Sequence, residues 1–138
     1  MMVWEPDPRE WSPRGYIPGE PISPEFVDAY LEAALWSTLD DHGIPFDKDF
    51  SIKDFSDKAV QKAVDDSNSF IKKNKKDLKA SGGNMEQHGH DFWLTRNGHG
   101  AGFWDRGYGK VGYRLTDAAH KYGELNIEKD AHGELHFW

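Results

Sequence analysis

The stretch that decides the fold runs from Gly89 to Gly107 and reads GHDFWLTRNGHGAGFWDRG. Two aromatic-rich segments, 90–96 and 101–106, flank the sequence NGHG at 97–100. Aromatic residues favour strands, and Asn-Gly between two such segments is a strong signal for a tight turn. The stretch therefore predicts a β-hairpin.

The length of the predicted turn decides which side chains would meet across the hairpin. A four-residue NGHG loop would place Trp93 opposite Trp104 and Asp91 opposite Arg106. The Asp91 carboxylate would then pair with the Arg106 guanidinium, which would lower the pKa of the aspartate. The two tryptophans would form a platform between this pair and the loop. A two-residue Asn-Gly turn, the other register considered, would separate Asp91 from Arg106.

The polar side chains of this hairpin form the candidate functional surface. One face would pack on helices through apolar side chains, while the loop would present Arg96, Asn97, His99 and Arg106 outward. Arginine, tryptophan and aspartate are residue types from which interface hot spots are often built. The candidate binding residues are Asp91, Trp93, Arg96, Asn97, His99, Trp104, Asp105 and Arg106.

The chain before the hairpin predicts two helices. Ser23 is a suitable N-cap, Pro24 suits the first helical position, and apolar residues follow at helical spacing until Gly43 ends the segment. A second amphipathic helix is expected from about Ser56 to Lys79, where a run of lysines suits the negative end of the helix dipole.

The chain after the hairpin predicts a short helix over 111–123 and a second hairpin over 124–138. Residues 23–138 are therefore expected to form one α+β domain: two N-terminal helices and a small, mostly antiparallel sheet of two hairpins with a short helix between them. Residues 1–22 hold five of the seven prolines and predict an extended arm. The expected core residues are Phe26, Leu31, Leu35, Val60, Val64, Ile71, Phe92, Leu94, Phe103, Leu115, Ala119 and Ile127.

The charge of the chain is unevenly distributed. The formal net charge is −7; residues 1–69 hold 15 acids and 6 bases, net −9, and residues 70–138 hold 9 acids and 11 bases, net +2. An acidic first half argues against nonspecific DNA binding and suits a basic partner surface. The absence of cysteine, of a signal-peptide pattern and of a long apolar run predicts a cytoplasmic protein without a membrane span.

A longer part of the chain resembles a known family. The segment HDFWLTRNGHGAGFWDRG followed by LTDAAHKYG, together with the upstream FVDAYLEAALWSTLDDHGIPFD, is similar to the signature of small proteins encoded by bacteriophages and related mobile elements. The resemblance spans about residues 25–128 and leaves the arm and the C-terminal HGELHFW unmatched. It implies a phage setting and the cytoplasm of an infected bacterium, and it implies no particular reaction.

The residues in and beside this stretch also allow two other kinds of site. GYGKVG at 107–112 has the G-x-G-x-x-G spacing of a dinucleotide fingerprint, but the chain is short for that fold. A looser anion site at the start of the following helix would use Gly107, Gly109 and Gly112. A metal site would use His88, His90 and His99, whereas histidines of this kind more often serve as hydrogen-bonding groups. No metal or other cofactor is expected.

The leading functional hypothesis is a phage accessory protein that binds and modulates a bacterial host factor, such as a defence protein or nucleic-acid machinery. The alternative is a small enzyme or ligand-binding domain that acts on a phosphorylated compound or nucleotide, with or without a metal. No nucleophile elbow or Ser-His-Asp order is recognisable, so the sequence leaves catalysis open.

Overall fold

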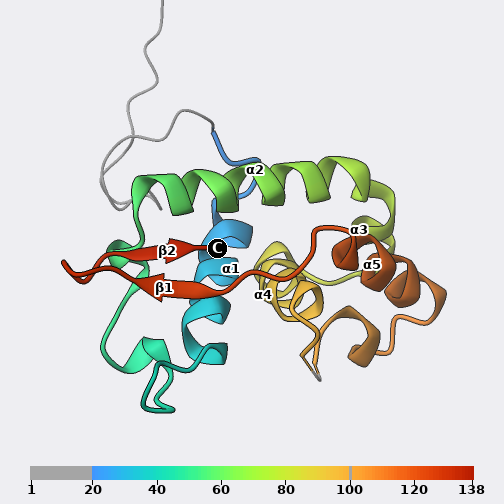
Figure 1. Ribbon diagram of the computed structural model, residues 1–138. Coiled ribbons are helices and arrows are strands. Elements are labelled where there is room, and N and C mark those ends of the chain that lie inside the picture. The colour runs from blue at the N-terminus through green and yellow to red at the C-terminus, as the bar shows by residue number, and fades with distance from the viewer. Residues whose placement is uncertain (1–19, 100) are drawn as a thin grey trace, which may run out of the picture.

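The computed structural model describes residues 20–99 and 101–138, so most of the predicted N-terminal arm lies outside the described residues. The α+β class is confirmed: the described chain forms five α-helices and one antiparallel hairpin (Figure 1). The helices are α1 (Pro24–Ser37), α2 (Asp57–Lys73), α3 (Lys75–Ser81), α4 (Met85–Arg96) and α5 (Lys110–His120); the strands are β1 (Ile127–Lys129) and β2 (Leu135–Phe137); three short 3-10 turns are η1 (Phe46–Lys48), η2 (Ile52–Asp54) and η3 (Phe103–Asp105).

The first predicted hairpin is wrong, because its first half is the helix α4 and its second half is a loop that contains η3. The α4 helix begins at Asn84, whose side chain accepts a hydrogen bond from the Gln87 amide at 2.8 Å. It ends at Asn97, whose side chain donates to the Trp93 carbonyl. Capping groups at both ends thus favour a helix over the strand that the aromatic residues suggested. The sheet consequently has one hairpin and not two.

The second predicted helix is divided in two. The α2 helix is capped by Ser56, as expected, but it ends at Lys73, and α3 follows after Asn74. The Asn74 side chain and amide both donate to the Phe70 carbonyl at the end of α2. From residue 20 to the central block, the chain therefore holds three helices and not the two predicted.

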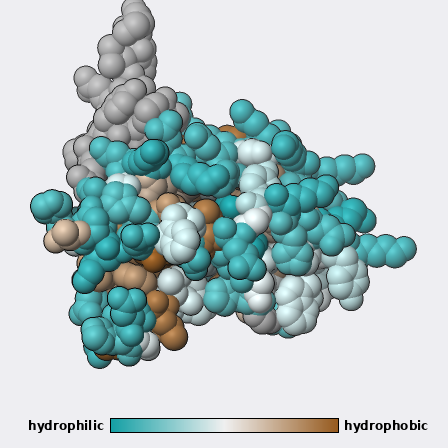
Figure 2. Space-filling model, in the orientation of Figure 1, coloured by the Kyte–Doolittle hydropathy of each residue, from teal (hydrophilic) through white to brown (hydrophobic). Residues whose placement is uncertain are grey.

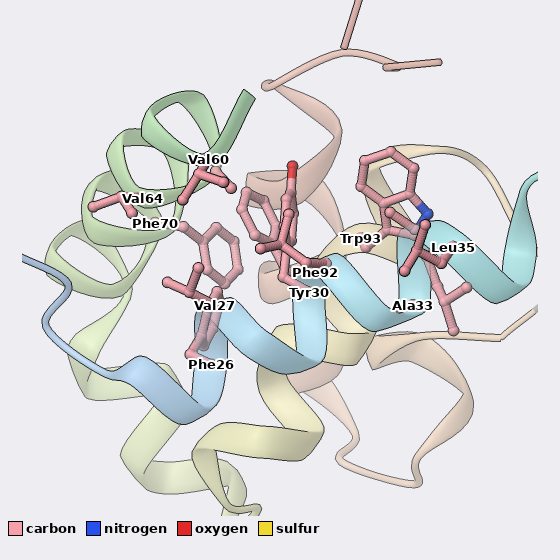
Figure 3. Packing of buried hydrophobic residues seen from close by; sticks show 14 of the residues in the cluster. Phe26, Val27, Tyr30, Ala33, Leu35, Val60, Val64, Phe70, Phe92 and Trp93 are labelled. Atoms are coloured by element: carbon pink, nitrogen blue, oxygen red, sulfur yellow. The ribbon is translucent and has the colours of Figure 1, made fainter. Parts of the chain in front are cut away.

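The α1 helix is the centre of the molecule. Ser23 caps it as predicted, by accepting a hydrogen bond from the Phe26 amide. Figure 3 shows its side chains packed against those of α2 and α4, with Phe70 of α2 beside Phe26 and Phe92 of α4 beside Tyr30. The Phe70 and Phe92 rings stack with centroids 4.3 Å apart, and all twelve predicted core residues are buried.

The contact between α1 and α4 depends on Gly89. A Cβ atom at this position would overlap the carbonyl oxygen of Phe26, which belongs to the backbone and cannot rotate away. Glycine in a helix normally lowers stability, so its presence inside α4 indicates a need for close approach. Gly89 therefore sets the distance between the two helices and the shape of the surface groove beside them.

The predicted C-terminal helix and hairpin are both confirmed. The α5 helix is followed by a turn at Gly123, and β1 pairs with β2 in the register Ile127–Phe137, Glu128–His136 and Lys129–Leu135. In Figure 1, α2 crosses the top of the molecule with the hairpin below one end and α3 and α5 below the other. Within the described residues, no helix has the length and apolar character needed to cross a membrane.

Candidate functional site

A cleft of about 390 Å³ lies where the N-terminal half of α4 meets α1. The α1 helix contributes three side chains three or four residues apart, which places them on one face of the helix. The α4 helix contributes its N-cap and first two turns, and the loop after η3 contributes one arginine. The lining residues are Ala29, Glu32, Trp36, Asn84, Glu86, Gln87, His90 and Arg106.

The wall of the cleft formed by Arg106 is fixed by Asp91. The fully buried Asp91 carboxylate accepts two hydrogen bonds from Arg106, at 2.8 Å from Nη2 and 3.0 Å from Nε. Burial alone would raise the pKa of Asp91, but the His90 imidazole and the Arg106 guanidinium lower it below its usual value. The predicted pair is therefore confirmed, although a loop and not a strand register brings its members together.

Trp36 and His90 form the aromatic part of the cleft. Their rings stack with centroids 5.3 Å apart and planes inclined by 29°. The His90 Nδ1 atom lies 3.7 Å from an Asp91 oxygen, which is too long for a hydrogen bond. Trp36 remains 42% exposed, so the stacked pair leaves a large part of the indole available to a ligand.

The cleft carries more negative than positive charge. Glu32 and Glu86 are exposed at its margin. Arg106, the one arginine or lysine that lines the cleft among residues 20–99 and 101–138, is already neutralised by the buried carboxylate behind it. Asp28 lies on the same helix as Glu32, and burial followed by repulsion from Glu32 and Glu25 raises its pKa to about 6. A cation in the cleft would therefore find uncompensated carboxylates.

Two further hollows continue this surface past Trp36. Glu32 and Trp36 also line a hollow of about 330 Å³ with Asp47 and Phe50. Phe50 in turn lines a hollow of about 730 Å³ beside β1. Figure 2 shows hydrophobic atoms among hydrophilic ones at the lower left, where the hairpin and the segment after α1 lie. We call the three hollows together the acidic–aromatic surface, characterised by Glu32, Trp36, Leu39, Asp40, Asp41, Asp47, Asp49, Glu86, Glu128 and Trp138.

No family model, curated protein or solved structure matches this chain. The resemblance to small phage proteins thus stays a prediction that rests on the quoted motifs.

Three of the eight predicted binding residues are buried, and Arg96 is one of them. The prediction that the central block presents Arg96 to solvent is therefore wrong. Asp91 and Trp93 are buried as well, and the Trp93 indole donates to Ser37 at 2.8 Å. Trp104 is 48% exposed, so the tryptophan platform is also wrong. The physical reason is that all six residues of the C-terminal half of α4, 91–96, are buried, so this half of the helix has no solvent face.

The remaining predicted residues lie in the loop after α4. Asn97 accepts a hydrogen bond from the Leu125 amide, which ties the end of α4 to the segment before β1. His99 is half-buried, whereas Asp105 is exposed. Of the eight candidates, Arg106 alone lines the cleft.

The three glycines of the anion-site hypothesis have packing and turn roles. Gly107 and Gly109 adopt positive φ angles of 75° and 66°, which allow the chain to turn into α5. Gly112 is buried, and a Cβ atom there would lie 2.9 Å from the Phe103 carbonyl oxygen. Anion binding by these residues stays a prediction.

The three histidines of the metal hypothesis do not come together. His88 is buried and its Nε2 lies 3.1 Å from the Ser81 hydroxyl, while His90 faces Trp36. Within residues 20–99 and 101–138, the set of ligand atoms close enough to share a metal ion belongs to Asp130, Glu134 and His136.

Glu32, Trp36 and Glu86 line the cleft but were not among the residues predicted from the sequence. One signal was available: Trp36 falls four residues after Glu32 on a helix whose apolar positions lie on other sides, which places an aromatic beside an acid on the solvent face. Glu86 lies before the predicted strand, which starts at His90, so its position on the first turn of α4 was not expected.

Proposed function

We propose that the protein is a binding module that docks onto a basic segment of a bacterial host protein, with a lysine or arginine side chain of the partner seated in the α1–α4 cleft. The observation that carries this proposal is the composition of the cleft: an exposed tryptophan flanked by Glu32 and Glu86, with its one cation already paired.

A partner cation would gain two interactions in this cleft. Its charge would lie near two carboxylates that have no cation opposite them in the cleft, and its flat or extended side chain could lie against Trp36. Cation–π contacts are worth about 0.5–2 kcal/mol, with the larger values where water is excluded. The acidic–aromatic surface would contact more than one side chain of the partner segment, because exposed Leu39 and Trp138 lie among further acidic residues.

The charge of the cleft disfavours the alternative function. A phosphorylated compound would need a cation with free donors, but Arg106 directs two nitrogens at Asp91. Two glutamates at the margin would repel a phosphate. The host setting is supported by the resemblance to phage proteins, and modulation of a defence or nucleic-acid protein belongs to the same proposal.

Capture from bacterial lysate with matched charge variants tests the proposal. The full chain would be immobilised as wild type, as Glu32→Lys/Glu86→Lys, and as Asp65→Lys/Asp117→Lys. Asp65 and Asp117 are exposed acids on α2 and α5, so both double variants change the net charge by the same amount. We expect a partner that is retained by the wild type and the control pair and lost by the cleft pair.

Cross-linking then identifies the partner segment, which should be rich in lysine or arginine. If both double variants lose the partner equally, only the overall charge of the protein matters. If both retain the partner equally, the cleft takes no part in the interaction. Trp36→Ala should weaken capture without changing the charge, which separates the aromatic contribution from the electrostatic one.

A further inference from the structure

Two turns of this chain have the same pattern of hydrogen bonds. Asp40 begins the sequence DDHG and Asp130 begins DAHG. In each, one aspartate oxygen accepts hydrogen bonds from the amides two and four residues later, at 2.8 and 3.0 Å. In each, a glycine at positive φ completes the turn, and its amide donates to the aspartate carbonyl. Because both turns have these bonds, an aspartate that accepts from two backbone amides is sufficient to form this kind of turn.

The second turn contains two side chains that the turn itself does not require. The Asp130 oxygen that is not used by the backbone lies 2.8 Å from His136 Nε2. The same His136 nitrogen lies 3.8 Å from a Glu134 oxygen. The three ligand atoms all lie within 4.8 Å of one another, whereas no such group surrounds Asp40 among the described residues.

The pairing of β1 with β2 explains why these groups share one side. Residues two apart on a strand share a face, so Glu134 and His136 do, and so do Glu128 and Asp130. Glu128 is directly opposite His136, and the Asp130 amide bonds to the Glu134 carbonyl. One face of the hairpin thus carries three acids and a histidine, while the other face carries buried Ile127 and Leu135.

We propose that this face binds a first-row divalent transition-metal ion of the zinc type, with Asp130, Glu134 and His136 as ligands. Imidazole nitrogen with carboxylate oxygens is a ligand set for zinc and its neighbours, and calcium and magnesium prefer oxygen alone. Tetrahedral ligands at about 2.0 Å from zinc lie roughly 3.3 Å apart, and the separations of 2.8 and 3.8 Å bracket that value.

The surroundings of Asp130, Glu134 and His136 favour a metal-binding site over a simple ion pair at the surface. Backbone amides of the turn orient the Asp130 carboxylate, as outer-shell hydrogen bonds orient ligands in metal sites. The His136, Asp130 and Glu134 side chains are 39%, 33% and 29% exposed, so an ion can enter and keep a water ligand. Glu128 is directly opposite His136 on the neighbouring strand and adds negative charge to this face, but its carboxylate is not one of the three grouped ligand atoms.

The experiment is a calorimetric titration of the full chain with Zn²⁺, repeated for three single variants. We expect one ion per wild-type chain and at least about a tenfold loss of affinity in His136→Gln, since even outer-shell changes cost that much. His132→Gln is the matched control, because His132 belongs to the same turn and contributes its amide and not its ring. His90→Gln tests the histidines of the central block.

Unfolding in the presence of a chelator should give the same urea midpoint for the wild type and His136→Gln, which shows that both fold. Added Zn²⁺ should then raise the midpoint of the wild type alone. No bound ion in the wild type, equal affinity in His136→Gln, or a loss in His132→Gln or His90→Gln of the same size would overturn the proposal.

Discussion

Two arginine–aspartate pairs hold the α4 helix, and they differ in which member is buried. Arg96 at the end of α4 has a side chain only 1% exposed, and it meets the Asp66 carboxylate of α2 at 2.8 Å. In the second pair, Asp91 is fully buried, and Arg106 is 34% exposed at the edge of the cleft. The first pair fixes the fold, whereas the second joins the fold to a surface.

The partners of the two arginines show the same difference. Arg96 also donates to the Tyr30 hydroxyl and to the carbonyls of Tyr122 and Gly123, so its donors reach α1 and the segment after α5. Its guanidinium lies 5.7 Å from the centre of the Tyr122 ring. Arg106 directs Nε and Nη2 at Asp91, and its Nη1 lies 3.1 Å from the side-chain amide of Gln87, a residue that lines the cleft. Because Arg96 is buried and all three of its guanidinium nitrogens donate to groups of the protein, it is not available to a ligand at the surface.

The largest effect is expected from Arg96→Met. The change removes the Arg96 donors from Asp66, the Tyr30 hydroxyl and two carbonyls, and leaves Asp66 paired with the exposed Lys62. Breaking a buried pair in this way costs about 4–5 kcal/mol. Urea unfolding monitored by circular dichroism measures the loss. The control is Arg114→Met, which breaks an exposed pair with Asp77 and should leave the urea midpoint unchanged. Equal midpoints for the two variants would remove the distinction drawn between buried and exposed arginines.

Arg106→Gln should have the next largest effect, because it leaves the Asp91 charge buried. We expect a loss of about 3 kcal/mol at pH 7, the lower end of the range for a buried pair, since Arg106 is partly solvated. The double variant Asp91→Asn/Arg106→Gln should recover part of this loss. Recovery would show that the unpaired charge, and not the missing packing, causes the instability.

The same variant has a defined pH dependence. The folded pKa of Asp91 lies below its usual value in the wild type, so the stabilisation is present above the unfolded pKa and is lost as the pH falls through the folded pKa. The difference between wild type and Arg106→Gln should therefore be largest at neutral pH and decrease below about pH 4. A difference that is constant from pH 3 to pH 7 would contradict this assignment.

Gly89→Ala should come third, because it acts on the helix contact that both pairs support. Overpacking of this kind costs about 1–3 kcal/mol, although alanine is the better helix former. The added methyl would push α1 away from α4 and widen the cleft. Stability and partner capture should thus decrease together, whereas Gly98→Ala, with open space around its Cβ position, should not affect capture.

The sequence predicted burial more accurately than secondary structure. The twelve core residues are all buried because apolar character alone drives burial, whichever element carries it. The prediction of the first hairpin was wrong because α4 has no apolar stripe on one side from which a helix could be recognised. Phe92, Trp93 and Leu94 are consecutive in the sequence, and all three are buried. The N-cap at Asn84, with Gln87 three residues later, was the signal that indicated a helix start.

The functional cleft was less predictable for a related reason. The Asp91–Arg106 pair was expected from a strand register that does not exist, and it forms because a loop returns the chain to α4. Glu32 and Trp36 come from a helix far away in sequence, and only packing through Gly89 brings them beside His90. Such contacts depend on the tertiary arrangement, which local sequence patterns do not contain.

The smallest effect, with the opposite sign, is expected from Asp28→Asn. Asp28 is partly buried like the acids of the two pairs, but within the described part of the chain one of its oxygens is buried without a hydrogen-bond partner, and the charged groups that act on it are Glu32 and Glu25. Burial, and then Glu32 and Glu25, raise its pKa from 3.8 to about 6. An aspartate with a raised folded pKa favours folding while it is protonated, so wild-type stability should fall as the pH rises from about 4 to about 6. Removing the charge should add about 1 kcal/mol of stability at pH 7, since water screens the exposed part of the group.

Urea midpoints at pH 4 and pH 7 measure the effect of Asp28→Asn. The midpoint of Asp28→Asn should rise above that of the wild type at pH 7 and not at pH 4, and the midpoint of Asp65→Asn, on the exposed face of α2, should rise at neither pH. A loss of stability in Asp28→Asn at pH 7 would mean that the carboxylate has a cationic partner, and Asp28 would then be a third member of the comparison and not its exception.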